Sequence, residues 1–186
     1  MTRPQRLSLV LTVLLLWTSA AWGASLQYTL PGSPITFADS AQTPTATWTL
    51  SALASGAGRL SARYDRGAGA GPSVWEMRCK VSLTGTVTVG QTLELYLATS
   101  DGTDADGALG TADASLASDK RRNLLFVGVL VTDQTTTNVT MTASFRNIYL
   151  PQRYFSLAIW NNTSLPIETS TSKHRCQMTP VPIQMQ

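Results

Sequence analysis

Residues 92–160 read TLELYLATSDGTDADGALGTADASLASDKRRNLLFVGVLVTDQTTTNVTMTASFRNIYLPQRYFSLAIW. This stretch begins with an alternating apolar segment at 92–99, continues through an aspartate- and glycine-rich loop at 101–113, and ends in further apolar segments. Alternation with a period of two residues is typical of half-buried strands, and no 3.6-residue periodicity lies between the segments. The layout predicts a β-sandwich with a long loop between two of its strands.

Eight short segments of the chain share this β-rich pattern and are separated by turn residues. They are 45–53, 59–66, 73–83, 92–99, 124–132, 138–145, 153–161 and 175–181. Glycines in SGAGR (55–59) and RGAGAGP (66–72) favour turns and would be costly inside helices. We therefore predict an all-β, eight-stranded antiparallel sandwich of jelly-roll type.

Three local patterns refine this prediction. Leu124–Val131 is apolar at nearly every position, which predicts a strand central to its sheet. The threonines at 135–137 precede Asn138 and predict a hairpin between the strands on either side. Residues 112–122 have moderate helix propensity, so a single helical turn is expected there.

The N-terminus has the organisation of a secretory signal. Arg3 and Arg6 precede the apolar run Leu7–Trp17, and residues 21–23 (Ala-Trp-Gly) form a small-x-small site for cleavage before Ala24. The run is shorter than the about 20 apolar residues that a membrane span needs, so no stable span is expected. The alternative is a retained apolar arm that packs on a neighbouring subunit.

The domain organisation follows from this reading. A length of 186 residues fits one domain. Residues 1–23 are the signal-like segment or retained arm, and the proline-punctuated residues 24–44 form an extended lead-in, the N-terminal arm of the fold. Residues 45–186 are the β-sandwich domain.

Charge gives no case for a nucleic-acid partner. The formal net charge is +3. Without the signal-like segment, 12 basic residues face 11 acidic ones. This balance creates no field for binding nucleic acid or an anionic membrane. The adjacent cations Lys120–Arg122 are interpreted as a solvated loop end, with a phosphate or partner contact as the alternative.

Two cysteines, Cys79 and Cys176, lie in alternating segments. Cys79 shares a face with Trp75 and Val81, and Cys176 shares one with Met178, so both are expected to point inward. In an exported chain they are a disulfide candidate, and the bond would be worth about 4 kcal/mol by closing a loop of roughly a hundred residues. In a cytoplasmic chain they would be two small core residues.

The loop at 101–113 contains the motif Asp104-x-Asp106-Gly107, which matches part of a calcium-binding loop. Asp101 and Asp113 add two carboxylates, and calcium prefers six to eight oxygen ligands. These four aspartates are the candidate metal ligands. No glutamate closes a twelve-residue loop, so a solvated turn-rich loop without cofactor is the other interpretation.

The sequence contains no recognisable catalytic constellation. His174 is the only histidine, and no G-x-S-x-G elbow accompanies it. We therefore expect a protein that is not an enzyme.

Several stretches of the chain resemble small β-sandwich virion proteins of tailed bacteriophages. These are LSALASGAGRLSARYDRGAGAGPSVWEMRCKV (50–81), LELYLATSDGTDADGALGTADA (93–114), NLLFVGVLVTD (123–133), RYFSLAIWNNTS (153–164) and MTPVP (178–182). The resemblance implies a structural protein of the virion, a decoration or cement subunit on the capsid or tail lattice. It implies contacts with the major capsid or other virion proteins, and homo-oligomers. It carries no site residues across.

A cleavable secretion signal departs from this family pattern, because phage particles assemble in the bacterial cytoplasm. A second hypothesis therefore stands beside the first. In it the chain is a secreted or periplasmic binding module that uses the loop ends of the sandwich to bind a glycan or a protein.

Overall fold

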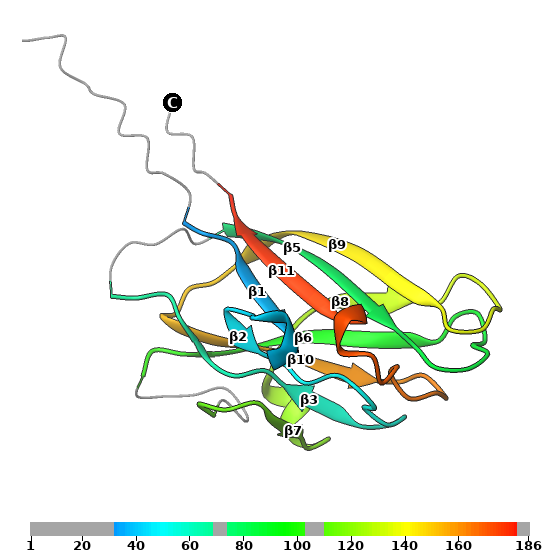
Figure 1. Cartoon of the computed structure of the whole chain (residues 1–186). Coiled ribbons are helices and arrows are strands. Elements are labelled where there is room, and N and C mark those ends of the chain that lie inside the picture. Colours follow the sequence, from blue (N-terminus) through cyan, green and yellow to red (C-terminus); the bar gives the residue numbers. More distant parts are fainter. Residues whose placement is uncertain (1–31, 69–73, 103–109, 182–186) are drawn as a thin grey trace, which may run out of the picture. The chain divides into compact units, whose positions relative to one another are not determined.

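The computed structural model describes residues 32–68, 74–102 and 110–181. These residues form two β-sheets that stack face to face (Figure 1). The predicted all-β sandwich of jelly-roll type is confirmed, and the described residues hold eleven strands and three short 3-10 helices. Within those same ranges, none of the helices is both apolar and long enough to cross a membrane.

One sheet has five strands. Its order is β2 (Ala46–Thr47), β1 (Ile35–Ala38), β11 (Arg175–Pro180), β5 (Val74–Ser82) and β9 (Thr140–Tyr149). All neighbours in this sheet are antiparallel except β1 and β2, which are parallel.

The other sheet has six strands, joined by antiparallel pairs. Its order is β7 (Ala114–Leu116), β3 (Gly58–Leu60), β10 (Tyr154–Asn161), β6 (Thr92–Ser100) and β8 (Leu125–Val131), with β4 (Tyr64–Asp65) also paired to β10. The 3-10 helices are η1 (Ser40–Gln42), η2 (Lys120–Asn123) and η3 (Thr171–Lys173).

Each of the eight predicted segments contains a strand, but two further strands were not predicted. β1 lies inside the expected lead-in 24–44 and pairs with β11, so the sandwich begins at Ile35 rather than at residue 45. β7 is a three-residue strand in the stretch where a helical turn was expected, and the turn itself, η2, follows it. Strands this short carry too few residues for alternation to show.

The predictions for the two segments around residues 135–137 were wrong. β8 is the last strand of its sheet, not a central one, because among the described residues it pairs only with β6. β8 and β9 do not form a hairpin, since β9 pairs with β5 in the other sheet. The chain between them therefore crosses from one layer to the other.

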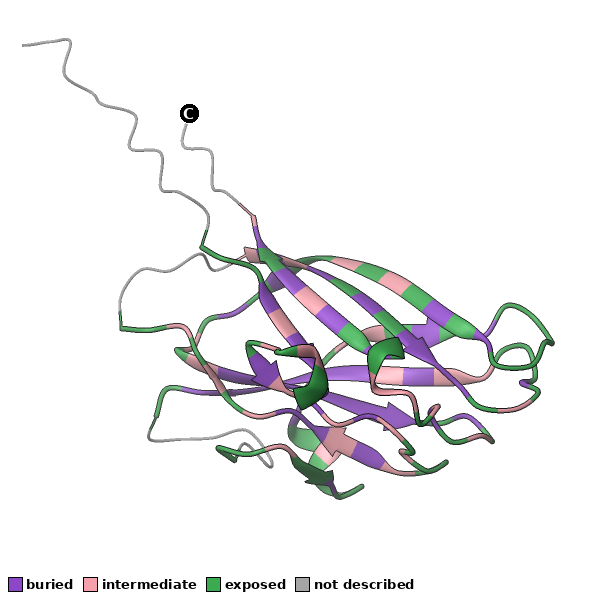
Figure 2. Ribbon diagram, in the orientation of Figure 1, coloured by how far each residue is buried: buried purple, intermediate pink, exposed green. Residues whose placement is uncertain are grey.

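The main core lies between the two sheets. Burial alternates along β5, as the colours of the ribbon show (Figure 2). Trp75, Cys79 and Val81 are buried, as the sequence predicted, and so is Met77. The inward residues of both sheets form one cluster, to which Trp48 also belongs. Its largest fully buried members include Trp48, Phe37, Phe155, Ile35, Leu50 and Met77.

The six-stranded sheet is also apolar on its outer face. Tyr96, Ala98, Ala158 and Trp160 alternate with the inward residues of β6 and β10 and form a second cluster. Its other members are Leu60, Leu116 and Leu124. The chain of β7 and η2 supplies two of these and thereby covers the outer face.

Two glycines allow close packing against this sheet. A Cβ on Gly58 would lie 2.6 Å from the Trp160 ring, so glycine at this position lets the indole pack closely against β3. A Cβ on Gly128 would lie 2.4 Å from the Phe145 ring, which therefore occupies the space beside β8. Phe145 belongs to β9, so it closes the core where the ends of the two sheets meet.

Cys79 and Cys176 form a disulfide, the pairing that the sequence allowed for an exported chain. The two residues face each other directly in the β5–β11 pair and are separated by 97 positions in the sequence. Both side chains are buried. The bond ties β11, the last strand of the chain and the middle one of this sheet, to its neighbour β5.

We expect reduction of this disulfide to lower the free energy of unfolding by about 4 kcal/mol, because the unfolded chain regains the entropy of a long closed loop. Urea unfolding of the oxidised chain and of the Cys79→Ala/Cys176→Ala double variant measures the difference. Reductant should leave the double variant unchanged. Identical unfolding curves for oxidised protein and double variant would contradict the expectation.

Candidate functional site

Only part of the predicted acidic site lies in the described residues. Asp104 and Asp106 fall in 103–109, outside them, and Asp101 lies at the start of that loop. In the described ranges no three acidic, histidine or cysteine residues gather as a metal site would require. Calcium binding by the full loop stays a prediction.

Asp113 has a different role from the one expected. Its two oxygens accept hydrogen bonds from Arg59 at 2.6 and 2.9 Å, and the amide of Thr49 donates to it at 2.9 Å. This bidentate pair raises the pKa of Arg59. A cation at Asp113 would have to displace the guanidinium, so the carboxylate ties β3 to the segment before β7.

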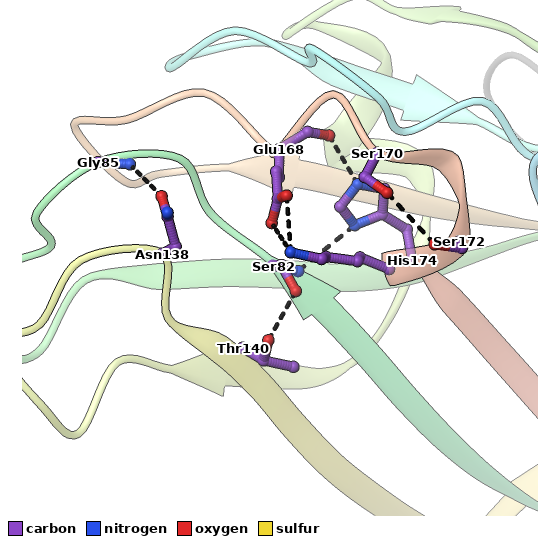
Figure 3. Close-up of polar contacts among 9 residues, drawn as sticks. Ser82, Gly85, Asn138, Thr140, Glu168, Ser170, Ser172 and His174 are labelled. Carbon is purple, nitrogen blue, oxygen red and sulfur yellow. Dashed lines mark hydrogen bonds and ion pairs between the residues drawn. The ribbon is translucent and has the colours of Figure 1, made fainter.

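His174 is held by backbone atoms (Figure 3). The amide of Ser82 lies 3.4 Å from Nδ1, and Nε2 lies 2.7 Å from the carbonyl oxygen of Glu168. This arrangement fits the tautomer in which Nδ1 accepts and Nε2–H donates. The hydroxyl of Ser82 instead pairs with Thr140 at 2.7 Å. The imidazole therefore fixes the chain before β11 onto the end of β5.

A cationic hollow lies on the outer face of the five-stranded sheet. We define it by Arg78 and Lys80 of β5, Arg175 and Gln177 of β11, and Thr142 and Ser144 of β9, which line a depression of about 430 Å³. Lys80 sits directly between Arg175 and Thr142, and Arg78 between Gln177 and Ser144.

Like charges meet in this hollow, and its described lining contains no acidic residue. Lys80 and Arg175 are cross-strand partners, an arrangement that is destabilising by itself. In the part of the chain that the structure describes, none of the three cations forms an ion pair. Glu76, farther along β5, pairs with Arg146 at 3.4 Å. The hollow is thus suited to an anionic or polyhydroxylated ligand.

A polar cluster centred on Glu94 lies on the outer face of the six-stranded sheet. The Glu94 carboxylate accepts hydrogen bonds from Tyr96, Asn162 and Arg121, the last at 2.9 Å. Burial, together with the bond to Glu94, raises the pKa of Tyr96 to about 12, so the phenol stays a donor at neutral pH. The Arg121 guanidinium lies 4.7 Å above the Trp160 ring.

Beside this cluster the terminal strand β8 exposes an apolar ridge. We define the β8 ridge as the exposed apolar residues of this strand, Leu125, Phe126, Val129 and Val131, whose exposed fractions are 51, 55, 36 and 48%. The last three face outward, and Leu125 lies opposite the inward residue Leu97 at the start of the strand. Phe126 also stacks edge-on against Tyr96, with 5.5 Å between the ring centroids. Elsewhere in the described chain only Val89 and Tyr149 are large apolar residues with comparable exposure.

The sequence did not indicate the Glu94 cluster or the β8 ridge as a site. Arg121 and Glu94 are 27 positions apart and meet only after the chain folds back over β6. The apolar run of β8 was seen, but it was taken as core. The alternation of β5 did place Arg78 and Lys80 on one outward face, and that signal marks one side of the hollow.

Comparisons with known proteins add little. No protein-family model matches the chain. No curated protein matches it either. Among solved structures it is similar to murine APRIL at pH 5.0, with a TM-score of 0.36 and 7% identity over 66% of this chain and 72% of that one. Murine APRIL at pH 8.5 gives a TM-score of 0.32 and 8% identity over 66 and 70%. Values this low support no conclusion about what this chain does.

The buried histidine predicts a pH dependence of stability. Burial lowers the pKa of His174 below its ordinary 6.5, against the opposing influence of Glu168 and Asp39. The unfolded chain therefore binds this proton more tightly. The stability from neutral His174 is full above about pH 7, and it is lost as pH falls below 6.5 toward the lower pKa of the folded state.

Urea unfolding between pH 5 and 8 should show this loss for the wild-type chain. We expect His174→Gln, which keeps a donor and an acceptor but does not titrate, to be less stable overall and to lose most of this slope. An unchanged slope in the variant would assign the pH dependence to other groups.

Proposed function

We propose that this chain is a non-enzymatic structural protein of a bacteriophage virion, a decoration or cement subunit bound to the capsid or tail lattice. The observation that supports it is the β8 ridge. A strand at the edge of a sheet with exposed apolar side chains is typical of a surface that contacts another protein. In natural monomers such edges usually carry charged residues or are covered by another segment. Leu124–Thr132 contains no charged residue.

The rest of the sandwich is organised to present that surface rigidly. The core fills the space between the sheets, and the Glu94 cluster fixes Tyr96, against which Phe126 stacks. Burying a whole aliphatic or aromatic side chain contributes about 1.5–3 kcal/mol, so half-exposed ridge residues each leave roughly 1 kcal/mol to be gained in a contact. Assembly through a preformed face suits a lattice-bound subunit.

Particle composition tests the proposal. Quantitative peptide mapping of density-purified particles should find the protein at structural copy number. Val129→Lys should reduce its occupancy at least several-fold, because a charge is then buried at the contact. Val89→Lys is the matched control, since Val89 is 55% exposed and lies outside the ridge.

Absence of the wild-type protein from particles would contradict the proposal. A mature Ala24 or Ser25 terminus in the exported fraction would then favour the second candidate.

The second candidate is a secreted or periplasmic module that binds a glycan or a protein. The cationic hollow favours it, because three cations, an amide and two hydroxyls converge on one concave face. Cations recognise sulfate or carboxylate groups, and the amide and hydroxyls suit sugar hydroxyls. A structural disulfide also fits an oxidising compartment.

Retention on immobilised sulfated dextran tests this candidate. Lys80→Glu should lower the salt concentration needed for elution, because it removes a cation from the centre of the hollow and adds an anion. Arg146→Glu is the control, as Arg146 lies on the neighbouring strand outside the lining. Equal effects of both variants would show retention by overall charge alone.

A further inference from the structure

We propose that two copies of this chain pair through the β8 ridge, with β8 of one copy antiparallel to β8 of the other, about a two-fold axis that crosses the strand near Gly128 and Val129. The inference rests on the proposed structural role, since it names the first contact of that assembly. The occupant of the ridge is thus a second copy of the same surface.

The ridge is apolar in both directions from its middle. β8 reads Leu-Phe-Val-Gly-Val-Leu-Val, so reversing the strand exchanges one apolar residue for another at each position. Two copies related by a two-fold axis place residues before the centre against residues after it. Exposed apolar side chains of one copy then meet exposed apolar side chains of the other, whereas Leu130 stays buried in the core of its own copy.

Charges at the two ends of the ridge favour the antiparallel arrangement. Lys120 and Arg122 stand before β8, and Asp133 follows it; all three side chains are exposed. Arg122 belongs to η2, just before β8, and Asp133 follows the strand, so an antiparallel arrangement places the cationic end of one ridge beside the acidic end of the other.

Neither of these two residues forms an ion pair within the described parts of the chain. A parallel arrangement would instead place the cations of one copy against those of the other. Charge complementarity of this kind sets orientation more than affinity.

The pairing uses side chains rather than a continuous ladder. A bulge in the β6–β8 register falls between the partners of Leu95 and Tyr96. It turns Phe126, Val129 and Val131 toward the outer face, where they line up with Tyr96, Glu94 and Thr92. A bulge also interrupts the free edge of a strand and opposes open-ended strand addition. The contact therefore closes at two copies.

Sedimentation velocity of the purified full chain tests the pairing. The wild-type chain should be dimeric at micromolar concentration. Val129→Lys should shift the dissociation constant at least tenfold toward monomer, whereas Val89→Lys should leave it unchanged. Equal melting temperatures of the two variants show that both are folded.

A charge exchange tests the orientation. Arg122→Asp and Asp133→Arg should each weaken the dimer several-fold, because each places like charges together at both ends of the ridge. The combined variant R122D/D133R should restore it. Restoration is expected only where residue 122 of one copy meets residue 133 of the other.

A single cysteine gives the position of the axis. Both native cysteines are engaged in the disulfide, so Val129→Cys introduces the only free thiol. On mild oxidation this thiol should form a disulfide with the same thiol of the second copy, whereas the thiol of Val89→Cys should not.

A wild-type chain that is monomeric at all concentrations, or a combined variant that stays weak, would overturn the pairing. A monomer found at structural copy number in particles would overturn the dimer and leave the virion role standing. A dimeric protein that is absent from particles would support the pairing and contradict the virion role.

Discussion

The structure depends on a sheet that is apolar on both faces. β6 and β10 bury their inward residues against the five-stranded sheet and their outward residues, such as Tyr96 and Trp160, under the chain of β7 and η2. Residues 114–124 pack across the sheet because they bury that outer face. Arg121 thereby lies over the Trp160 ring and forms an ion pair with Glu94. The cover ends at Leu124. β8, which continues the same sheet, is left without it, so the ridge follows from the same constraint as the core.

Local alternation carried enough information for most of the fold. It located a strand in each of the eight predicted segments and correctly placed Trp75, Cys79 and Val81 on the inward face. In a half-buried strand every second residue is apolar, so the pattern is visible in the sequence. It did not locate β1, whose four residues sit between prolines and gain their place only by pairing with β11. Pairing between distant segments depends on register and on which edges meet, and neither leaves a local pattern.

β8 shows where such a prediction fails for a physical reason. Its residues are apolar on both faces, as in a central strand, yet among the described residues only β6 pairs with β8, and four of its apolar side chains are exposed. An apolar composition indicates that a strand is buried, but it does not indicate whether the same chain or another protein buries it. The Glu94 cluster and the cationic hollow escaped prediction in a similar way, since each joins residues from separate strands or turns. Only Arg78 and Lys80, two positions apart on β5, left a sequence signal.

The two surfaces lie on opposite outer faces of the sandwich and differ in chemistry, and this separation bears on how they would be used. The ridge belongs to the six-stranded sheet and is apolar with charges only at its ends. The hollow belongs to the five-stranded sheet, and its lining combines three cations with uncharged polar residues. A contact that covers the ridge leaves Lys80 and Arg175 exposed on the far face. A dimer would therefore present two cationic hollows. Weak binding at one hollow would strengthen binding at the other wherever two anionic groups lie on one surface. Assembly and ligand binding are thus compatible in this fold, because each uses a layer that the other leaves free.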